Sequence, residues 1–431
     1  MQTAITSLGP CLFPSPLTRN GLCGTYFRSD DERVLCDHTL EFFNQARTQK
    51  EPPPSFEIAG PRAKIFFDPR RTKAGIVTCG GLCPGLNDVI RSLVMVLHHT
   101  YGIETIFGFR YGYEGLVPSF GRVPLQLRPE NVVAIHKMGG TILGTSRGPQ
   151  DVGVMVDTLD EMGIDMLFVI GGDGSIRGAG EITEEIQRRG LHKAVVCIPK
   201  TIDNDIMYVD KCFGFETAVA EAGKVISCAH AEAMGAINGI GLVKLMGRDS
   251  GFIASLATLA CSEVNFVLIP EVPFKLEGSG GMLEHLRKRL NNRKHAVIVV
   301  AEGAGKDLVA EEGTDASGNQ KLGDIGIYLR DKITAYFKEL NIETTLKYID
   351  PSYTIRSVPA STQDNVYCSR LAQHAVHAAM AGKTAMVIGR WHGSYVNMPT
   401  DLVVHGRRKV DPEGELWQAV IETTGQPARF E

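Results

Sequence analysis

The feature that most constrains the fold of this chain is a repeated order of segments: a short apolar run, a turn rich in glycine or acidic residues, and then a helix. The runs are rich in β-branched residues and do not alternate with polar ones, which is typical of strands buried on both faces. Strands are therefore predicted at 74–78, 166–170, 194–198, 241–245, 265–269 and 296–300. The order predicts an α/β protein with mainly parallel sheets, arranged as two lobes.

Two of the intervening helices can be predicted from their apolar spacing. One spans 176–189, between the second and third strands. The other follows the first strand and places five apolar residues on one face: Val89, Ile90, Leu93, Val94 and Leu97. Ligands bind at the edge of such sheets where the strands end, so the turns before these helices are the places to look for function.

The first seventy residues differ from the rest, because their periodicity is weak and they contain the turn-rich stretch 51–55. We expect an N-terminal extension at 1–70 without chemistry of its own. A first lobe is predicted at 71–214, a second lobe with a return segment at 215–395, and a C-terminal segment at 396–431.

Charge and cysteine usage limit the class of protein. A formal net charge of −4 over 431 residues gives no basic field, which argues against a nucleic-acid partner. No apolar run approaches the roughly 20 residues that cross a bilayer, and no secretory signal is visible at residues 1–20. Scattered cysteines in apolar segments (Cys79, Cys197, Cys228 and Cys261) favour reduced core thiols in a cytoplasmic compartment. Cys79 and Cys83 lack a second pair at ligand spacing, so a metal site there is not favoured.

The turn after the first strand is glycine-rich and runs from Cys79 to Asp88. Glycines let backbone N–H groups approach an anion, and the positive end of the following helix adds to the attraction. The turn matches neither the Walker A pattern nor the dinucleotide GxGxxG pattern. It is either a phosphate-binding turn or an ordinary strand-to-helix turn.

The turn after the second strand, Gly171-Gly-Asp-Gly-Ser175, adds a carboxylate between glycines. Asp173 beside bound phosphates suits Mg²⁺, which takes oxygen ligands and bridges to phosphate. The alternative is that Asp173 caps the following helix.

The third strand leads into Pro199-Lys-Thr-Ile-Asp-Asn-Asp205. In an extended segment Asp203 and Asp205 point the same way, so one can accept a proton from a hydroxyl while the other orients the site or contacts Mg²⁺. Phosphoryl transfer needs a base, a metal and cations in one place. The alternative is a polar surface loop, which would explain the acidic residues but not their occurrence together with two turns of the phosphate-binding type.

Taken together, these motifs resemble the 6-phosphofructokinase family, which has them in the same order. The motifs are Gly80-Gly81, Gly171–Ser175, Pro199–Asp205, Met246-Gly-Arg248, Pro270-Glu271 and Ala301-Glu-Gly303. The resemblance covers roughly residues 70–395 and is nearest to the ATP-dependent branch known from plants and trypanosomatids. It implies two Rossmann-like lobes with the active site in the cleft, Mg²⁺ as cofactor, ATP and fructose 6-phosphate as substrates, and a homodimer or homotetramer.

The resemblance also implies roles for individual residues. Asp203 is implied to be the base that takes the proton of the sugar hydroxyl, with Thr201 and Asp205 beside it, and Asp173 the Mg²⁺ ligand. Donor binding is implied for Gly81, Arg147, Gly148, Gly172, Asp173, Gly174 and Ser175. Sugar-phosphate binding is implied for Thr201, Ile202, Asp203, Met246, Gly247, Arg248, Glu302, Lys347, Tyr353, Thr354, Ile355 and Arg356.

Two positions bear on the phosphoryl donor. In the pyrophosphate-dependent members an Asp commonly replaces Gly174 and a Lys stands at position 200, whereas this chain has Gly174 with Lys200. An Asp at 174 would occupy the space of the α-phosphate of ATP and repel its charge. The glycine therefore favours ATP, and Lys200 is expected to contact a phosphoryl group.

Three departures from the bacterial ATP-dependent pattern stand at Gly239, Lys347 and Tyr353. Because of these departures, the subunit-bridging contacts and allosteric effectors of that branch are not assigned to this chain. The alternatives are a pyrophosphate-dependent enzyme, a non-catalytic regulatory subunit of the same fold, and activity on another sugar phosphate such as sedoheptulose 7-phosphate.

Overall fold

The computed structural model describes residues 2–20, 26–49, 52–314 and 320–431. By its internal contacts the chain divides into two compact units. Unit 1 comprises Met1–Thr201, Ile206–Gly214 and Ser357–Gly406, and unit 2 comprises Ile202–Asp205, Phe215–Arg356 and Arg407–Glu431. Each unit has an α/β architecture, and the two are described separately.

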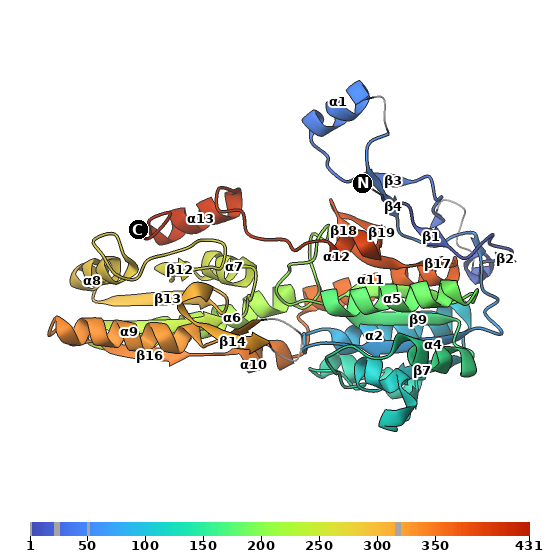
Figure 1. Ribbon diagram of the computed structural model, residues 1–431, viewed down its shortest axis with the longest axis horizontal. Helices are drawn as coiled ribbons and strands as arrows, with labels where there is room; N and C mark the ends of the chain where they lie inside the picture. Colours follow the sequence, from blue (N-terminus) through green and yellow to red (C-terminus); the bar gives the residue numbers. More distant parts are fainter. Residues whose placement is uncertain (1, 21–25, 50–51, 315–319) are drawn as a thin grey trace. The chain divides into compact units, whose positions relative to one another are not determined.

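Unit 1 contains a mixed sheet of nine strands within the described residues (Figure 1). In spatial order these are β3 (Arg33–Leu35), β4 (Ser55–Ile58), β19 (Ser394–Pro399), β18 (Met386–Trp391), β10 (Ala194–Pro199), β9 (Met166–Gly171), β6 (Lys73–Thr78), β7 (Thr105–Phe109) and β8 (Leu125–Gln126). The strands from β18 to β7 run parallel, and the outer strands are antiparallel. The central strands β6, β9 and β10 confirm the three predicted from sequence.

Helices cover this sheet because each central strand is apolar on both faces. On one face, α4 (Val152–Glu161) and α5 (Asp173–Arg188) share a core cluster with Val169 and Val195 of the strands. Helix α2 (Leu86–Met95) packs against α11 (Thr362–Met380), which contacts β10. The five apolar residues predicted to share a face of the helix after β6 are all fully buried.

Unit 2 contains a parallel sheet in the order β12 (Phe266–Leu268), β13 (His295–Ala301), β11 (Gly239–Leu245) and β16 (Thr345–Ile349). Alternate residues of a strand point to opposite faces, and two separate cores result. One core unites the sheet with α6 (Phe215–Met234), α7 (Phe252–Cys261) and α13 (Glu415–Thr424), and the other with α8 (Met282–Arg293) and α9 (Ile325–Glu339). The strands predicted from sequence in this half are all present.

The N-terminal segment is built into unit 1. Strand β1 (Thr6–Ser7) pairs with β17 (Lys383–Thr384), β2 (Phe13–Pro14) pairs with β5 (Lys64–Ile65), and β4 pairs with β19. Between β3 and β4 the chain forms α1 (Leu40–Gln49), which stands clear of the sheet in Figure 1. The backbone of this segment therefore extends the sheet of unit 1.

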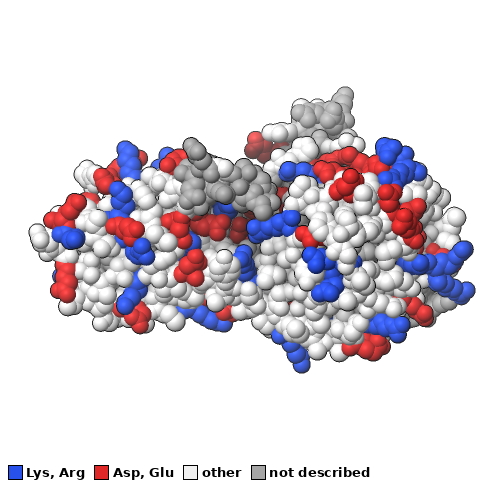
Figure 2. All heavy atoms as spheres, turned by 60° about the horizontal axis from the view of Figure 1, so that its bottom comes forward, with Lys and Arg blue, Asp and Glu red and all other residues white. Residues whose placement is uncertain are grey.

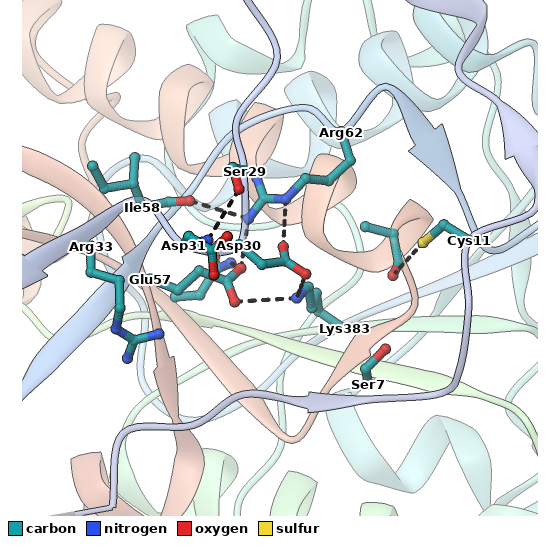
Figure 3. Close-up of polar contacts among 12 residues, drawn as sticks. Ser7, Cys11, Ser29, Asp30, Asp31, Arg33, Glu57, Ile58, Arg62 and Lys383 are labelled. Atoms are coloured by element: carbon teal, nitrogen blue, oxygen red, sulfur yellow. Dashed lines mark hydrogen bonds and ion pairs between the residues drawn. The ribbon is translucent and has the colours of Figure 1, made fainter.

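A buried charge network ties the N-terminal segment to the rest of unit 1 (Figure 3). Arg62 donates to Glu57 at 2.7 Å and to Asp30 at 2.8 Å. Lys383 lies 3.2 Å from Glu57 and 3.0 Å from Asp30, and Asn397 donates to Glu57 at 2.7 Å. The Glu57 side chain is only 5% exposed, so its carboxylate is the buried anion on which two cations and an amide converge.

Replacing Glu57 by alanine should lower the free energy of unfolding of unit 1 by about 3 kcal/mol, because Arg62 and Lys383 would lose their shared buried partner. Urea denaturation followed by the fluorescence of Trp391, whose indole donates to the Cys36 carbonyl in this unit, measures the effect. The matched control is Asp31→Ala, which removes an exposed carboxylate from the same segment. An equal and small effect of both substitutions would show that the network does not stabilise the fold.

Three further predictions from the sequence concern the cysteine thiols, membrane-spanning segments and the charge of the surface. The cysteines among the described residues are free; Cys79 and Cys197 are buried as expected, but Cys228 is exposed because α6 turns that position to solvent. No helix in the described part of the chain is long and apolar enough to span a membrane. Figure 2 shows acidic and basic side chains interspersed over the face in view, in keeping with the near-neutral composition.

Candidate active site

Three loops of unit 1 meet at the carboxyl ends of its central parallel strands. The turn after β6 is tied to the neighbouring loops by Cys79 N–H donating to the Ile170 carbonyl at 2.9 Å and Gly80 N–H donating to the Ser146 carbonyl at 3.0 Å. The side chain of Thr145 donates to the Gly80 carbonyl at 2.5 Å. Gly80 has a φ of 83°, a left-handed conformation that favours glycine. The turn after β6 therefore lies beside residues 145–148, which include the predicted donor-binding pair Arg147 and Gly148.

The Asp173 turn opens helix α5 directly after β9. The helix begins at Asp173 and Gly172 occupies the N-cap, so Asp173 does not hold the capping position that the alternative reading gave it. A carboxylate in the first turn is favoured by the positive end of the helix. A Cβ added at Gly174 would meet no atom within 4 Å, so the space beside this residue is open.

Lys200 links the third loop to the first. Its backbone N–H donates to the Gly171 carbonyl at 2.9 Å, and its side-chain Nζ donates to the Gly81 carbonyl at 2.6 Å. Burial raises the pKa of the Cys79 thiol to about 12, with Lys200 opposing the rise, so this thiol is not a reactive one. Hydrogen bonds thus join the turns after β6, β9 and β10 and the loop at 145–148, which carry the residues predicted to bind the donor.

The predicted base lies in unit 2, within the segment Ile202–Asp205. Burial raises the pKa of Asp203 well above its ordinary value, and the negative charges of Asp205 and Glu302 raise it further, while a hydrogen bond from the Arg248 backbone opposes the rise. The Oγ of Ser250 donates to the Asp203 carbonyl at 3.0 Å. A carboxyl group with a raised pKa has the basicity that proton abstraction from a hydroxyl requires.

The predicted sugar-binding residues follow strands β11 and β13. Gly247 has a φ of 125°, which only glycine adopts readily. Its carbonyl accepts from Gly303 N–H at 3.1 Å, and Glu302 N–H donates to the Leu245 carbonyl at 2.9 Å. These bonds join the two strand ends. A cavity of about 200 Å³ there is lined by Lys244, Arg248, Glu302, Gly323, Asp324 and Ile325.

The segment predicted to bind the sugar phosphate forms helix α10 (Ser352–Ser357). Arg356 lies over the exposed ring of Tyr353, 4.6 Å from its centroid, and its charge reaches Glu302. The side chain of Ile355 is buried in the core of unit 2, so it can offer a ligand only its backbone. Lys347 is exposed on β16. Arg356 thus lies near the cavity residues, whereas Ile355 packs in the core of unit 2 and holds helix α10 against it.

Sequence reasoning missed the ion pairs that support this cavity. Lys244 Nζ lies 2.5 Å from Asp324 and 2.8 Å from Asp350, and Asp324 also accepts from the Tyr348 hydroxyl at 2.9 Å. Burial opposes the charged form of Lys244, but the bonds to both aspartates raise its pKa. The lysine in the otherwise apolar strand β11 was the sequence signal that could have identified these ion pairs. Asp350 directly precedes the α10 segment, so Lys244 connects the cavity floor to that segment.

The chain is similar to known proteins over most of its length. Residues 73–379 match the family described as phosphofructokinase. The chain is 49% identical to an ATP-dependent 6-phosphofructokinase from Amycolatopsis methanolica, over 98% of this chain and 94% of that one. It is also 49% identical to ATP-dependent 6-phosphofructokinase 7 from Arabidopsis thaliana, over 86% of this chain and 77% of that one.

A solved structure has a similar fold at low identity. A pyrophosphate-dependent phosphofructokinase from Marinobacter aquaeolei aligns with a TM-score of 0.68 at 20% identity, over 82% of this chain and 91% of that one. The likeness to the plant relative agrees with the branch that the sequence motifs indicated. The family match spans most of the chain and includes the loops of both units, so this chain belongs to the phosphofructokinase family.

Proposed function

We propose that this protein is an ATP-dependent 6-phosphofructokinase. It transfers the γ-phosphoryl group of ATP to the 1-hydroxyl of fructose 6-phosphate and releases fructose 1,6-bisphosphate and ADP. The observation that supports the chemistry most directly is Asp203, a buried carboxyl group whose pKa is raised by burial and by the charges of Asp205 and Glu302. Its relatives named as ATP-dependent enzymes support the donor.

The loops of unit 1 bind the donor in this proposal. Backbone N–H groups near Gly81 and from Gly172 to Ser175 approach the phosphates, and the start of α5 adds its positive end. Arg147 and Gly148 lie on the loop hydrogen-bonded to the Gly80 turn. Lys200 provides a cation beside the same turn. Together these groups offset the charge of a triphosphate in a protein whose net charge is negative.

Asp173 fits a role as ligand of Mg²⁺. The described residues contain no group of three acidic, histidine or cysteine ligands that could hold a metal. Mg²⁺ usually takes only one or two carboxylates from a protein and completes its shell with phosphate oxygens and water, so a single aspartate beside bound phosphates is chemically sufficient. When bound with ATP, the ion would neutralise part of the phosphate charge.

Asp203 acts as the base of the reaction. It takes the proton of the 1-hydroxyl as the new O–P bond forms and the bond from the γ-phosphorus to ADP breaks. Thr201 and Asp205 flank it in the chain, and Arg248 provides positive charge for the transferring group. A raised pKa keeps the carboxylate basic enough to accept that proton.

The acceptor is held by residues of unit 2. Glu302 and Arg248, the last residue of the Met246–Arg248 turn, line the cavity and present hydrogen-bonding groups to sugar hydroxyls. Arg356, with Tyr353, Thr354 and Lys347 nearby in the chain, supplies the planar fork and the charge suited to the 6-phosphate. Ile202 and Ile355 contribute through their backbone.

An assay that crosses two donors with two sugar phosphates tests the proposal. Purified protein with Mg²⁺ should phosphorylate fructose 6-phosphate with ATP far faster than with pyrophosphate, and faster than it phosphorylates sedoheptulose 7-phosphate. Turnover with pyrophosphate but none with ATP would establish the pyrophosphate-dependent alternative. Absence of turnover with every pair, in a folded protein, would leave the regulatory-subunit alternative.

Assembly and location belong to the same proposal. Family resemblance favours a homodimer or homotetramer, and free thiols together with a glycolytic reaction favour the cytoplasm. Sedimentation of the purified protein would measure the assembly.

A further inference from the structure

Arg407 belongs to no motif found in the sequence, yet its guanidinium reaches the acidic residues around Asp203. Its Nη1 lies 3.5 Å from Oδ2 of Asp205 and forms an ion pair with Asp249. The backbone N–H of Arg408 donates to the Asp205 carbonyl at 2.8 Å. All of these residues lie in unit 2. The start of the segment Arg407–Glu431 thus holds the acidic loop through both its main chain and its side chain.

Arg407 contacts two carboxylates, Asp205 and Asp249, and each of them is linked to the loop that carries Asp203. Asp205 follows Asp203 in the same short loop. Asp249 precedes Ser250, whose Oγ donates to the Asp203 carbonyl at 3.0 Å. A guanidinium presents several N–H donors in one rigid plane, so it can fix two carboxylates at a set separation. Fixing both neighbours fixes the backbone from which the Asp203 side chain extends.

The charges around Asp203 explain why a cation belongs there. Asp205, Glu302 and Asp249 all raise the pKa of Asp203 by repulsion, in addition to its burial. Burial alone would raise the pKa of Asp249, but Lys306 and Arg407 lower it. Lys306 pairs with Asp249, and Arg407 contacts both Asp249 and Asp205. Without Arg407, the repulsion between these carboxylates would be opposed less.

We infer that Arg407 is a positioning residue for phosphoryl transfer: by bridging Asp205 and Asp249 it holds Asp203 where it can take the proton of the acceptor hydroxyl. This inference rests on the proposed function, in which Asp203 is the base. Arg407 has no need to touch either substrate. Its loss should therefore affect turnover rather than binding of the sugar phosphate.

Arg407→Ala tests the inference, with Arg407→Lys as the conservative variant. The alanine variant should have a kcat lower by about 10- to 100-fold, as expected when a catalytic group is displaced by a fraction of an ångström, with little change in KM for fructose 6-phosphate. The lysine variant should recover part of the loss. Since the Arg407 side chain is 35% exposed, millimolar guanidinium should enter the vacated place and raise the kcat of the alanine variant.

Arg429→Ala is the matched control, because it removes an exposed arginine from the same C-terminal segment. It should keep the wild-type kcat and show no response to guanidinium. A wild-type kcat in Arg407→Ala would overturn the inference. So would an equal loss in the alanine and lysine variants with no rescue and a lowered melting temperature, since that pattern indicates a structural role only.

Hydrogen exchange separates this inference from the proposed function. The backbone amides of residues 202–205 should exchange faster in Arg407→Ala than in wild type or in Arg429→Ala, whether or not turnover is observed. If the wild-type protein fails to phosphorylate fructose 6-phosphate, the proposed function is wrong, and exchange still decides whether Arg407 holds the loop. Unchanged exchange in these amides would contradict that role.

Discussion

Replacing Asp203 by asparagine should lower kcat by about 10²- to 10⁴-fold, the usual contribution of a general base. Asparagine keeps the size and most of the hydrogen bonding of the side chain, so KM for fructose 6-phosphate should change little. The rate of the variant should not follow the titration of this side chain, whereas the wild-type rate should fall on the acid side as Asp203 becomes protonated, so the difference should be largest at higher pH. Because its pKa is raised, that fall should begin at a higher pH than for an ordinary aspartate. Steady-state kinetics at several pH values measure these effects.

Stability provides the control for this substitution. The folded state raises the pKa of Asp203, so it binds this proton more tightly than the unfolded chain does. The fold therefore loses stability as pH rises from the unfolded toward the folded pKa, and the full cost is present above the latter. Asparagine removes that cost, so the variant should melt no lower than wild type at neutral pH and should be less sensitive to pH. Near-normal turnover in a stable variant would refute the assignment of the base.

Gly174→Asp should reduce kcat/KM for ATP by about 10- to 100-fold, because a carboxylate near the α-phosphate costs about 1–3 kcal/mol at protein-like dielectric. An aspartate at position 174 should not disturb the fold, so the expected loss of activity should come from its repulsion of ATP. A Cβ added at this position would meet no atom within 4 Å, and an aspartate in the first turn of α5 suits the helix dipole. Initial rates with varied ATP, at saturating fructose 6-phosphate, measure the change.

Gly174→Ala is the matched variant, since it adds bulk without charge. It should retain more ATP-dependent activity than the aspartate variant, and both should melt like wild type. Unchanged ATP kinetics in Gly174→Asp would show that this position does not select the donor. Equal losses in both variants would assign the selection to size alone.

The central strands and the loops that follow them could be predicted from local sequence. Runs such as 166–170 are apolar on both faces, and glycine with aspartate directly after a strand indicates a turn at the sheet edge. The sequence also indicated that Asp203 lies among other acids, because Asp205 is two residues away. The proposed roles of the individual residues stay predictions, as do the domain limits at residues 70, 214 and 395.

Other features depend on contacts between distant parts of the chain. The short strands β3 and β4 are irregular in sequence and form only because β19, more than 300 residues later, offers an edge. Arg407 stands in a run of three basic residues that resembles an exposed surface stretch, about 200 residues after Asp205. Its role follows only from packing, since nothing in the local pattern indicates which acid it meets.

The pairing of β4 with β19 limits how far the chain can be shortened from its start. A protein beginning at residue 71 would lose Glu57 and leave Lys383 and Asn397 buried beside a missing carboxylate. It would also leave β19 with unpaired backbone N–H and C=O groups on one side. Such an open edge recruits strands from other molecules, so the shortened chain would tend to aggregate. The first seventy residues thus cover the edge of β19, and we expect their removal to lower solubility.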